Sequence, residues 1–377
     1  MSIKILKGNC LETLSSLKEK SVNTCVTSPP YWGLRDYGTG EWIGGDPNCT
    51  HKGKSKIGNN CITGHKEMYG QDNAVGNSIY KSECPDCGAV RKDEQLGLEE
   101  TPEKFVENLV KLFREVKRVL RDDGTVWLNL GDTYYNYRSD GKYPKQTVSK
   151  TKQDLPEFST ARGNKLDGLK SKDLIGIPWR VAFALQADGW YLRQDIIWNK
   201  PNPMPESVKD RCTKSHEYIF LLSKSKNYYF DNEAIKENST ESSKNRLRQN
   251  IEDQKGSSRV PYKTNGNMNA VGGETRNKRS VWTVTTKPYS EAHFATYPHD
   301  LIIPCILAGS PEGGTVLDPF GGSGTTAQVA SNLNRNAILC ELNPDYVDIA
   351  EKRLNENLGM FMDLTVDTPL RKEKQNG

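Results

Sequence analysis

The sequence predicts an α/β protein built on a doubly wound, mainly parallel sheet. Apolar segments of strand length alternate with segments of helical periodicity in three blocks along the chain. Long polar stretches, too poor in apolar residues to form cores of their own, separate these blocks. Strands that alternate with helices favour parallel pairing through crossover connections. We therefore expect one α/β domain that is interrupted by polar insertions.

The individual elements follow from periodicity and from start and stop signals. Thr101-Pro102-Glu103 reads as a helix cap followed by proline at the first helical position. Asp122-Asp123-Gly124 is expected to end that helix before the next strand. The expected helices cover residues 10–18, 102–121, 179–187, 299–308, 325–333 and 345–355. The expected strands cover residues 3–6, 22–27, 125–130, 191–198, 217–223, 315–318 and 337–341.

Shifts in composition divide the chain into six parts. The α/β domain is expected to resume after each polar insertion, and the last residues form a tail. The domain occupies residues 1–45, 99–235 (with a polar loop at 137–173) and 281–358, the insertions occupy 46–98 and 236–280, and the tail occupies 359–377.

Composition limits the function classes. A net charge of +4 is too small to identify a nucleic-acid binder by itself. No stretch approaches the ~18 consecutive apolar residues of a membrane helix, and the N-terminus lacks a signal-peptide pattern. Nine cysteines in such a chain favour reduced thiols or metal ligands over disulfides. We expect a cytoplasmic protein without a membrane partner.

A glycine-rich turn joins the strand over 315–318 to the helix over 325–333. Glycines let a ligand approach the backbone, and the helix N-terminus offers free N–H groups to a carboxylate. The next strand ends in Glu341, an acid placed to accept hydrogen bonds from ribose hydroxyls. A dinucleotide fold would show G-x-G-x-x-G, which is absent here, and a turn used only for packing leaves Glu341 unexplained. The turn predicts an adenosine-type cofactor and reads Asp318-Pro319-Phe320-Gly321-Gly322-Ser323-Gly324-Thr325.

A second loop, Ser28-Pro29-Pro30-Tyr31, follows the apolar strand over 22–27. Two prolines fix the backbone and remove two N–H donors, so carbonyl groups face the site. An amino group on a base is a poor nucleophile because its lone pair is delocalised into the ring. Ser28 Oγ and the Pro29 carbonyl can accept its two protons, and Tyr31 can stack on the base. The alternative, a rigid turn without chemistry, loses weight beside the cofactor loop.

Together the two loops resemble the catalytic and cofactor motifs of amino-methylating (N4-cytosine or N6-adenine) DNA methyltransferases. The catalytic motif precedes the cofactor motif with a variable basic stretch between them, an order similar to the beta group of that family. The resemblance implies S-adenosylmethionine as cofactor, double-stranded DNA as partner, and a flipped target base. It also implies a circularly permuted, seven-stranded type of sheet in which the strand over 3–6 follows the C-terminal strands.

The resemblance also implies roles for single residues. Asp318 faces the methionine ammonium, Pro319 to Thr325 line the cofactor, and Glu341 holds the ribose. The permuted order places Asn9 near the adenine ring, although the family usually has Asp at this position. Ser28, where N6-adenine enzymes more often have Asp, favours cytosine N4 as the target, with adenine N6 as the alternative.

The first insertion contains a candidate zinc site. Cys84-Pro85-Asp86-Cys87-Gly88 has the knuckle form of zinc ribbons, and Cys49-Thr50-His51 can supply the remaining pair of ligands. Cys61 and His65 are rival ligands, and solvent-facing cysteines in a loop are the alternative to any metal. A metal would explain how a stretch without an apolar core folds. We expect a structural zinc on Cys49, His51, Cys84 and Cys87.

The second insertion, 236–280, is rich in Arg, Lys and Asn and is expected to recognise the target sequence. The loop at 137–173 is a second candidate for phosphate contacts. A cognate restriction endonuclease acting on the same site is a possible partner. Two other functions compete: N-methylation of a glutamine amide in a protein, which is associated with Asn before the prolines and the opposite motif order, and a non-catalytic zinc-containing DNA-binding protein.

Overall fold

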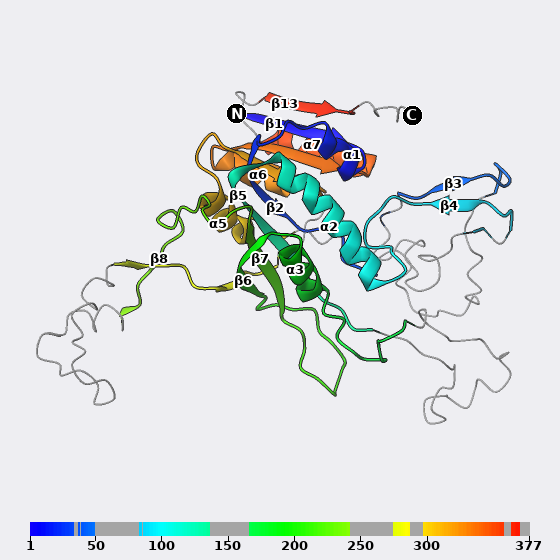
Figure 1. Cartoon of the computed structure of the whole chain (residues 1–377), viewed down its shortest axis with the longest axis horizontal. Helices are drawn as coiled ribbons and strands as arrows, with labels where there is room; N and C mark the ends of the chain where they lie inside the picture. The colour runs from blue at the N-terminus through cyan, green and yellow to red at the C-terminus, as the bar shows by residue number, and fades with distance from the viewer. Residues whose placement is uncertain are drawn as a thin grey trace, which may run out of the picture.

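The computed structural model describes residues 1–33, 37, 39–49, 83–84, 86–135, 166–241, 274–286, 297–357 and 363–369. Its centre is a nine-stranded sheet in the order β10-β6-β7-β5-β2-β11-β12-β1-β13 (Figure 1). Every neighbouring pair is parallel except the two that involve β7. The predicted α/β class and mainly parallel sheet are therefore confirmed.

The bounds of the elements are as follows. The strands are β1 (Ser2–Lys7), β2 (Val22–Thr27), β3 (Glu41–Ile43), β4 (Val90–Lys92), β5 (Leu120–Leu130), β6 (Tyr191–Asn199), β7 (His216–Ser223), β8 (Glu237–Asn238), β9 (Thr275–Arg276), β10 (Val281–Thr283), β11 (Thr315–Asp318), β12 (Asn336–Glu341) and β13 (Asp363–Asp367). The helices are α1 (Cys10–Ser15), α2 (Pro102–Val119), α3 (Ile177–Ala187), α5 (His299–Gly309), α6 (Thr325–Asn332) and α7 (Pro344–Asn357).

The permuted order of the sheet is confirmed by the pairing of β1. This N-terminal strand lies parallel to β12, with Ile3 opposite Ala337 and Lys7 opposite Glu341. Gly8 N then donates to Glu341 O at 2.8 Å, which fixes the turn that leads to Asn9. The residues that follow β1 therefore lie beside Glu341, at the end of β12.

Two strands extend the expected seven. β10 adds to the β6 edge, and β13 pairs in parallel with β1 at the opposite edge. β13 lies in the segment expected to be a tail, so that expectation is wrong for residues 363–367. The segment Asp-Leu-Thr-Val-Asp alternates polar and apolar residues, but it is too short for periodicity alone to reveal a strand.

Helix α2 begins as the sequence predicts but ends earlier. Thr101 Oγ1 accepts the Lys104 N–H at 3.2 Å, and Pro102 occupies the first turn. The helix stops at Val119, and β5 starts immediately at Leu120, so Asp122-Asp123-Gly124 lies within a strand and not in a terminating turn. Pairing of Leu120 with Val22, with an irregularity before Thr24, overrides the local turn preference of these residues.

The helices cover both faces of the sheet. Side chains from α1, α2 and α3 pack into one buried cluster, which includes Leu14, Phe113 and Val181. Side chains from α5, α6 and α7 pack into the other, which includes Leu301 and Ala327. Figure 1 shows α1, α2 and α3 together in front of the sheet. Among the described residues, no helix has both the length and the apolar character that crossing a membrane requires.

Candidate active site

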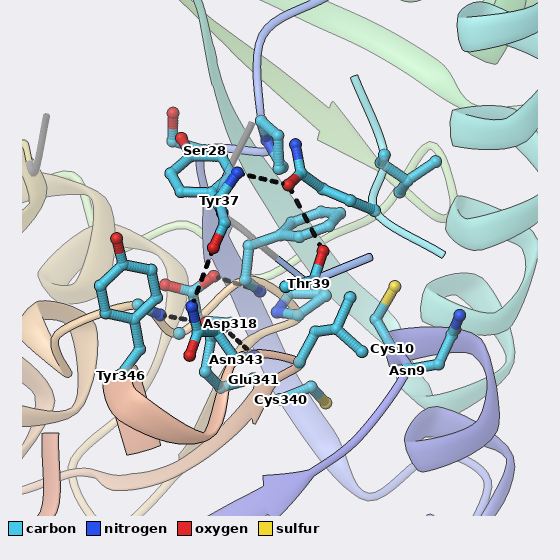
Figure 2. A pocket seen from close by; sticks show the side chains of 18 of the residues that line it. Asn9, Cys10, Ser28, Tyr37, Thr39, Asp318, Cys340, Glu341, Asn343 and Tyr346 are labelled. Carbon is cyan, nitrogen blue, oxygen red and sulfur yellow. Dashed lines mark hydrogen bonds between the residues drawn. The ribbon is translucent and has the colours of Figure 1, made fainter. Parts of the chain in front are cut away.

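The loops that follow β2, β11, β12 and β1 meet at the carboxyl ends of these strands, because parallel neighbouring strands end on the same side of the sheet. They surround a pocket of about 1040 Å³, including the part open to solvent. Figure 2 shows Asp318 and Glu341 grouped with Asn343 beneath Tyr37, with Asn9 on the opposite wall from Tyr346. The predicted residues that line this pocket are Asn9, Ser28, Pro30, Asp318, Pro319, Phe320, Gly321, Gly322, Ser323, Thr325 and Glu341.

The catalytic loop and the cofactor loop are joined by a direct hydrogen bond. Thr27 Oγ1, at the end of β2, donates to Asp318 Oδ1 at 2.6 Å. The two residues are 291 positions apart in the sequence. Ser28 follows Thr27 directly, so this bond holds the candidate catalytic serine beside the glycine-rich turn.

Asp318 is almost completely buried, and both of its carboxylate oxygens accept hydrogen bonds. Phe320 N donates to Oδ1 at 3.0 Å, and Tyr297 Oη donates to Oδ2 at 2.9 Å. Thr326 Oγ1 also donates to Oδ2. Burial raises the pKa of Asp318 to about 6, against the lowering effect of these donors. Asp318 thus organises the loop from within, and it still faces the pocket.

Glu341 is held at the mouth of the glycine turn by two backbone N–H groups. Gly322 N donates to Oε2 at 2.8 Å, and Asn343 N donates to Oε1 at 2.8 Å. Burial is the largest cause that raises the pKa of Glu341, and these two N–H groups oppose it. Each carboxylate oxygen has a second lone pair, so the group can also accept from hydroxyls of a ligand in the pocket.

Two glycines in the turn are required by geometry. Gly322 has φ of 50° and directs its N–H to Glu341. Gly324 has φ of 79° at the N-cap of α6, and a Cβ there would lie 3.2 Å from the Ala350 side chain of α7. Glycine alone adopts such conformations without strain. The turn therefore brings backbone and helix N-terminus close to the pocket.

The Ser-Pro-Pro-Tyr loop divides between the pocket and the core. Ser28 and Pro30 line the pocket, Pro29 is buried, and Tyr31 is not part of the lining. The Tyr31 ring packs against Gly131, where a Cβ would meet it at 2.5 Å. Its hydroxyl donates to Glu217 Oε2 at 2.7 Å. Burial is the main cause that raises the pKa of this hydroxyl.

Asn9 combines a structural contact with its place in the pocket. Its Oδ1 accepts from Leu11 N at 2.9 Å and so caps α1. Its Nδ2 donates to Glu94 Oε2 at 3.1 Å. Glu94 also lines the pocket, so this residue pair supplies one polar wall.

Several lining residues were not found from the sequence. Tyr37 N donates to Gln95 Oε1 at 2.7 Å, and Asn343 Nδ2 donates to Tyr37 O at 3.1 Å, so residue 37 is fastened across the pocket (Figure 2). Tyr297 lines the pocket from the segment before α5. Of these residues, Asn343 could have been recognised from the sequence. It stands two positions after Glu341 and directly before Pro344, as a helix cap does, and its Oδ1 accepts from Asp345 N. Tyr37 and Gln95 lie in polar sequence without periodicity.

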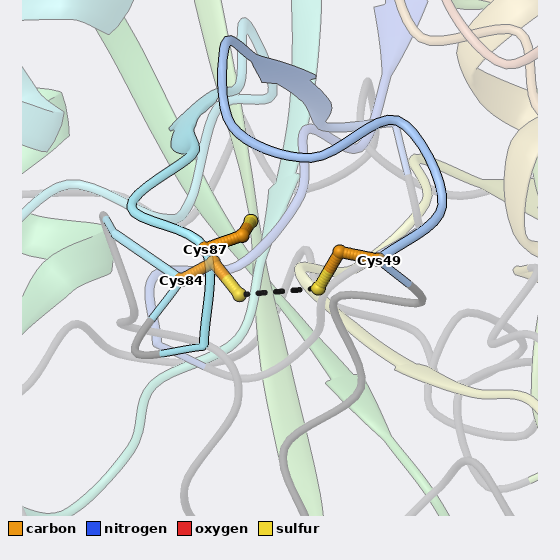
Figure 3. Close-up of side chains that lie close together, drawn as sticks. All are labelled: Cys49, Cys84 and Cys87. Carbon is orange, nitrogen blue, oxygen red and sulfur yellow. Dashed lines mark hydrogen bonds between the residues drawn. The ribbon is translucent and has the colours of Figure 1, made fainter.

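Three cysteines of the first insertion come together. The sulfur atoms of Cys49, Cys84 and Cys87 all lie within 4.8 Å of one another, and Cys49 Sγ is 3.8 Å from Cys84 Sγ (Figure 3). A tight turn presents the last two, because Cys84 N donates to Ala89 O at 2.7 Å and Gly88 N donates to Cys84 O at 2.8 Å. His51, Cys61 and His65 lie outside the described residues.

The ends of the second insertion form a small two-stranded sheet from β8 and β9. Arg276 Nε and Arg279 Nε both contact Glu237 Oε1, at 3.0 and 2.8 Å. Residues 242–273, which contain most of its Arg and Lys residues, lie outside the described part of the chain, as does most of the loop at 137–173.

Comparisons with known proteins identify the family of this chain. A family model described as DNA methylase, which covers N6 and N4 methyltransferases, matches residues 22–352. The chain therefore belongs to the N6/N4 DNA methyltransferase family. Within it, the chain is similar to two Type II methyltransferases. M.Cfr9I of Citrobacter freundii is 42% identical over 354 residues, covering 93% of this chain and 87% of that protein. M.SmaI of Serratia marcescens is 39% identical over 353 residues, covering 94% and 91%.

Solved structures share the fold. The PvuII DNA methyltransferase (cytosine-N4-specific) superposes with a TM-score of 0.53 at 16% identity, covering 93% of this chain and 87% of that chain. A putative DNA modification methylase from Thermus thermophilus, solved with S-adenosyl-L-methionine, has a TM-score of 0.50 at 19% identity, covering 97% and 99%.

Proposed function

We propose that this enzyme transfers a methyl group from S-adenosylmethionine to N4 of a flipped cytosine in double-stranded DNA. The observation that carries the proposal is the Thr27–Asp318 hydrogen bond, which holds Ser28 beside the glycine-rich turn in one pocket. The neighbouring candidate, N6 of adenine, uses the same pocket and the same kind of amino group.

The pocket fits the cofactor by its donor set. Each oxygen of Glu341 accepts one backbone N–H and keeps a lone pair for a ribose hydroxyl. The glycine turn offers backbone N–H groups at the start of α6 to a carboxylate. Asp318 supplies negative charge for an ammonium group. The Asn9–Glu94 pair offers polar atoms to the edge of a purine ring. When bound, the cofactor supplies a methyl group on a positively charged sulfur.

The chain's own residues prepare the amino group of the base. Ser28 Oγ accepts a hydrogen bond from one N–H of this group, and the Pro29 carbonyl accepts one from the other. With both protons bound, the nitrogen approaches a tetrahedral geometry and its lone pair points into the pocket. When the methyl group forms its bond to the nitrogen, its bond to the cofactor sulfur breaks, and the nitrogen then releases one proton to water. Unstacking the base costs a few kcal/mol. Stacking on Tyr31 would offset ~1–3 kcal/mol of this cost, but it requires the base to reach the ring where it packs beside Gly131, outside the pocket lining.

Cytosine is favoured by the residue at the head of the catalytic loop. Ser28 stands where the resemblance associates Asp more often with adenine N6 transfer. Both bases present an amino group on a six-membered ring, so the pocket geometry itself does not separate them.

The test is transfer of labelled methyl groups to unmethylated DNA, followed by digestion to nucleosides. Label on N4-methylcytosine supports the full proposal, and label on N6-methyladenine replaces cytosine by adenine. Ser28→Ala should lose at least about 100-fold in rate, the scale of one positioned catalytic group. Ser15→Ala, which removes an exposed serine of α1, is the matched control and should transfer at the wild-type rate.

A function of another class, a zinc-containing DNA binder without turnover, predicts cofactor and DNA binding with no labelled nucleoside. The continuous pocket shared by both loops favours the enzyme. Labelled DNA in the same experiment would eliminate the binding-only alternative.

We also propose that Cys49, Cys84 and Cys87 bind a structural zinc ion, with His51 as fourth ligand. Tetrahedral thiolates with Zn–S bonds of about 2.3 Å lie about 3.8 Å apart, and the Cys49–Cys84 separation is 3.8 Å. A disulfide would need about 2.05 Å. The backbone N–H of Ala89 is the largest cause that lowers the pKa of Cys87, which favours the thiolate that a metal requires.

Metal analysis tests this site. Wild type and the control Cys212→Ser, which changes an exposed cysteine elsewhere, should each contain one zinc per chain. Cys87→Ser should contain well under one and should melt at a lower temperature. Wild type purified without chelator and containing no zinc would remove the proposal.

We propose further that residues 236–280 select the target sequence and that methylation protects that site from a cognate endonuclease. Exchange of this segment for that of a relative should change the methylated sequence. Unchanged specificity would reject the assignment.

A further inference from the structure

The connection between β6 and β7 carries an unusual apolar side chain. It runs over residues 200–215, and Met204 stands between Pro203 and Pro205. Met204 is 84% exposed, more than any other large hydrophobic side chain of the described residues. Single exposed apolar residues are common on proteins. Whether the exposure of Met204 indicates a function therefore depends on how the backbone holds it and on how near it lies to the candidate active site.

The connection is fastened at several points. Lys200 N donates to Ser215 O at 2.7 Å and closes its base. Asn202 exchanges two hydrogen bonds with Thr286, at 3.1 and 3.2 Å. Because prolines on both sides also restrict the backbone, Met204 is presented on an ordered support.

The second half of the connection, residues 206–215, is also held by contacts with neighbouring segments. The Arg211 guanidinium lies 3.8 Å from the Tyr134 ring centre and 2.6 Å from Glu206 Oε2. Lys172 forms an ion pair with Asp210 at 2.5 Å. The parts of the connection before and after Met204 therefore both contact neighbouring segments, while the Met204 side chain stays exposed.

The base of the connection adjoins the catalytic loop. Lys200 forms an ion pair with Glu217, the same carboxylate that accepts the Tyr31 hydroxyl at 2.7 Å. Met204 is four residues from Lys200, so it lies at most about 14 Å along the chain from that pair. β6 runs in the same direction as β5 and β2, so the connection starts at the carboxyl ends of the strands, where Ser28 also lies. It extends beyond the sheet in Figure 1.

We propose that Met204 inserts into the DNA base stack beside the target base and stabilises the flipped state. The inference rests on the proposed DNA methyltransferase function and adds a partner contact to it. Apolar side chains inserted between base steps offset the cost of unstacking. An unbranched methionine adapts to an irregular gap. The exposed Lys209 of the same connection suits contact with a flanking phosphate.

The test compares two duplexes that carry the sequence methylated by the wild type. One is fully paired, and the other has an abasic site opposite the target base, where flipping requires less energy. Met204→Ala should lower kcat/KM 10- to 100-fold on the paired duplex but less than about threefold on the abasic duplex. Met204→Leu should recover most of the rate. Val366→Ala, which changes an exposed residue of β13 at the other edge of the sheet, should match wild type on both.

A second readout follows flipping directly. With 2-aminopurine at the target position and thymine opposite it, so that the duplex stays fully paired, wild type should raise the fluorescence on binding. Met204→Ala should raise it much less at saturating protein. Equal rates and equal fluorescence for Met204→Ala and Val366→Ala would overturn the proposal, as would a defect of the same size on both duplexes. A wild type that methylates no DNA would instead overturn the proposed function on which the inference depends.

Discussion

Replacement of Asp318 by Asn should change the pH dependence of stability by an amount that the structure defines. Burial raises the pKa of Asp318 from 3.8 to about 6 in the folded protein. At about 1.4 kcal/mol per pKa unit, this corresponds to about 3 kcal/mol of folding free energy. Because the folded pKa lies above the unfolded value, the contribution of Asp318 is fully present below about pH 4. It is lost as the pH rises through about 6.

Asp318→Asn does not titrate and keeps most of the local hydrogen bonds. Asn Oδ1 can accept from Thr27 and Phe320 N, and its amide can donate to the hydroxyls of Tyr297 and Thr326. The free energy of unfolding of the variant minus that of wild type should therefore rise by about 2 kcal/mol between pH 4 and pH 6.5, most of the full ~3 kcal/mol. Taking the difference cancels the other carboxylates, which both proteins share.

Urea denaturation at several pH values, without cofactor, measures this difference. The same variant should bind S-adenosylmethionine about 10-fold more weakly at pH 7.5, since it loses the negative charge that faces the ammonium group, an attraction of ~1–4 kcal/mol at close range. A stability difference that stays constant from pH 4 to pH 6.5 would refute the assigned pKa shift. Unchanged cofactor affinity would reject Asp318 as the partner of the ammonium group.

Three further substitutions test separate parts of the site and fold. Gly324→Ala should cost about 1–2 kcal/mol, because φ of 79° is unfavourable for alanine and its Cβ would press on Ala350; thermal melting and cofactor titration should show both a lower Tm and weaker binding. Tyr297→Phe removes a donor to Asp318 Oδ2, so the pKa of Asp318 should rise further and the decline in cofactor affinity on acidification should begin at a higher pH; an unchanged pH profile would contradict this. Thr101→Ala removes the cap of α2 and should cost about 1 kcal/mol in urea denaturation without any effect on cofactor affinity.

The fold could be predicted where local and tertiary preferences agree. Thr101 and Pro102 start α2 in sequence and in structure, because capping and helix packing act together. Asp122-Asp123-Gly124 misled the prediction because a turn preference of adjacent residues competes with pairing to β2, and the pairing prevails. β13 was missed because a five-residue strand is defined by its neighbour β1 more than by its own pattern.

The residues of the candidate site also fall into those that local sequence motifs predict and those that only distant contacts bring together. Ser28 and Asp318 could be predicted because each belongs to a short motif at a strand end, where chemistry and chain geometry are local. Tyr37 and Gln95 reach the pocket through contacts with segments far away in sequence, which no spacing reveals. Tyr31 was expected in the pocket, but its hydroxyl turns toward Glu217, a partner 186 positions away.

The most direct test of the central claim is mass spectrometry of nucleosides from DNA of cells that express this protein and have no other DNA methyltransferase. N4-methylcytosine is expected with the wild type and a much smaller amount with Ser28→Ala, while both proteins bind S-adenosylmethionine with equal affinity. DNA without any methylated amino group in the wild-type cells, despite cofactor binding by the purified protein, would contradict it.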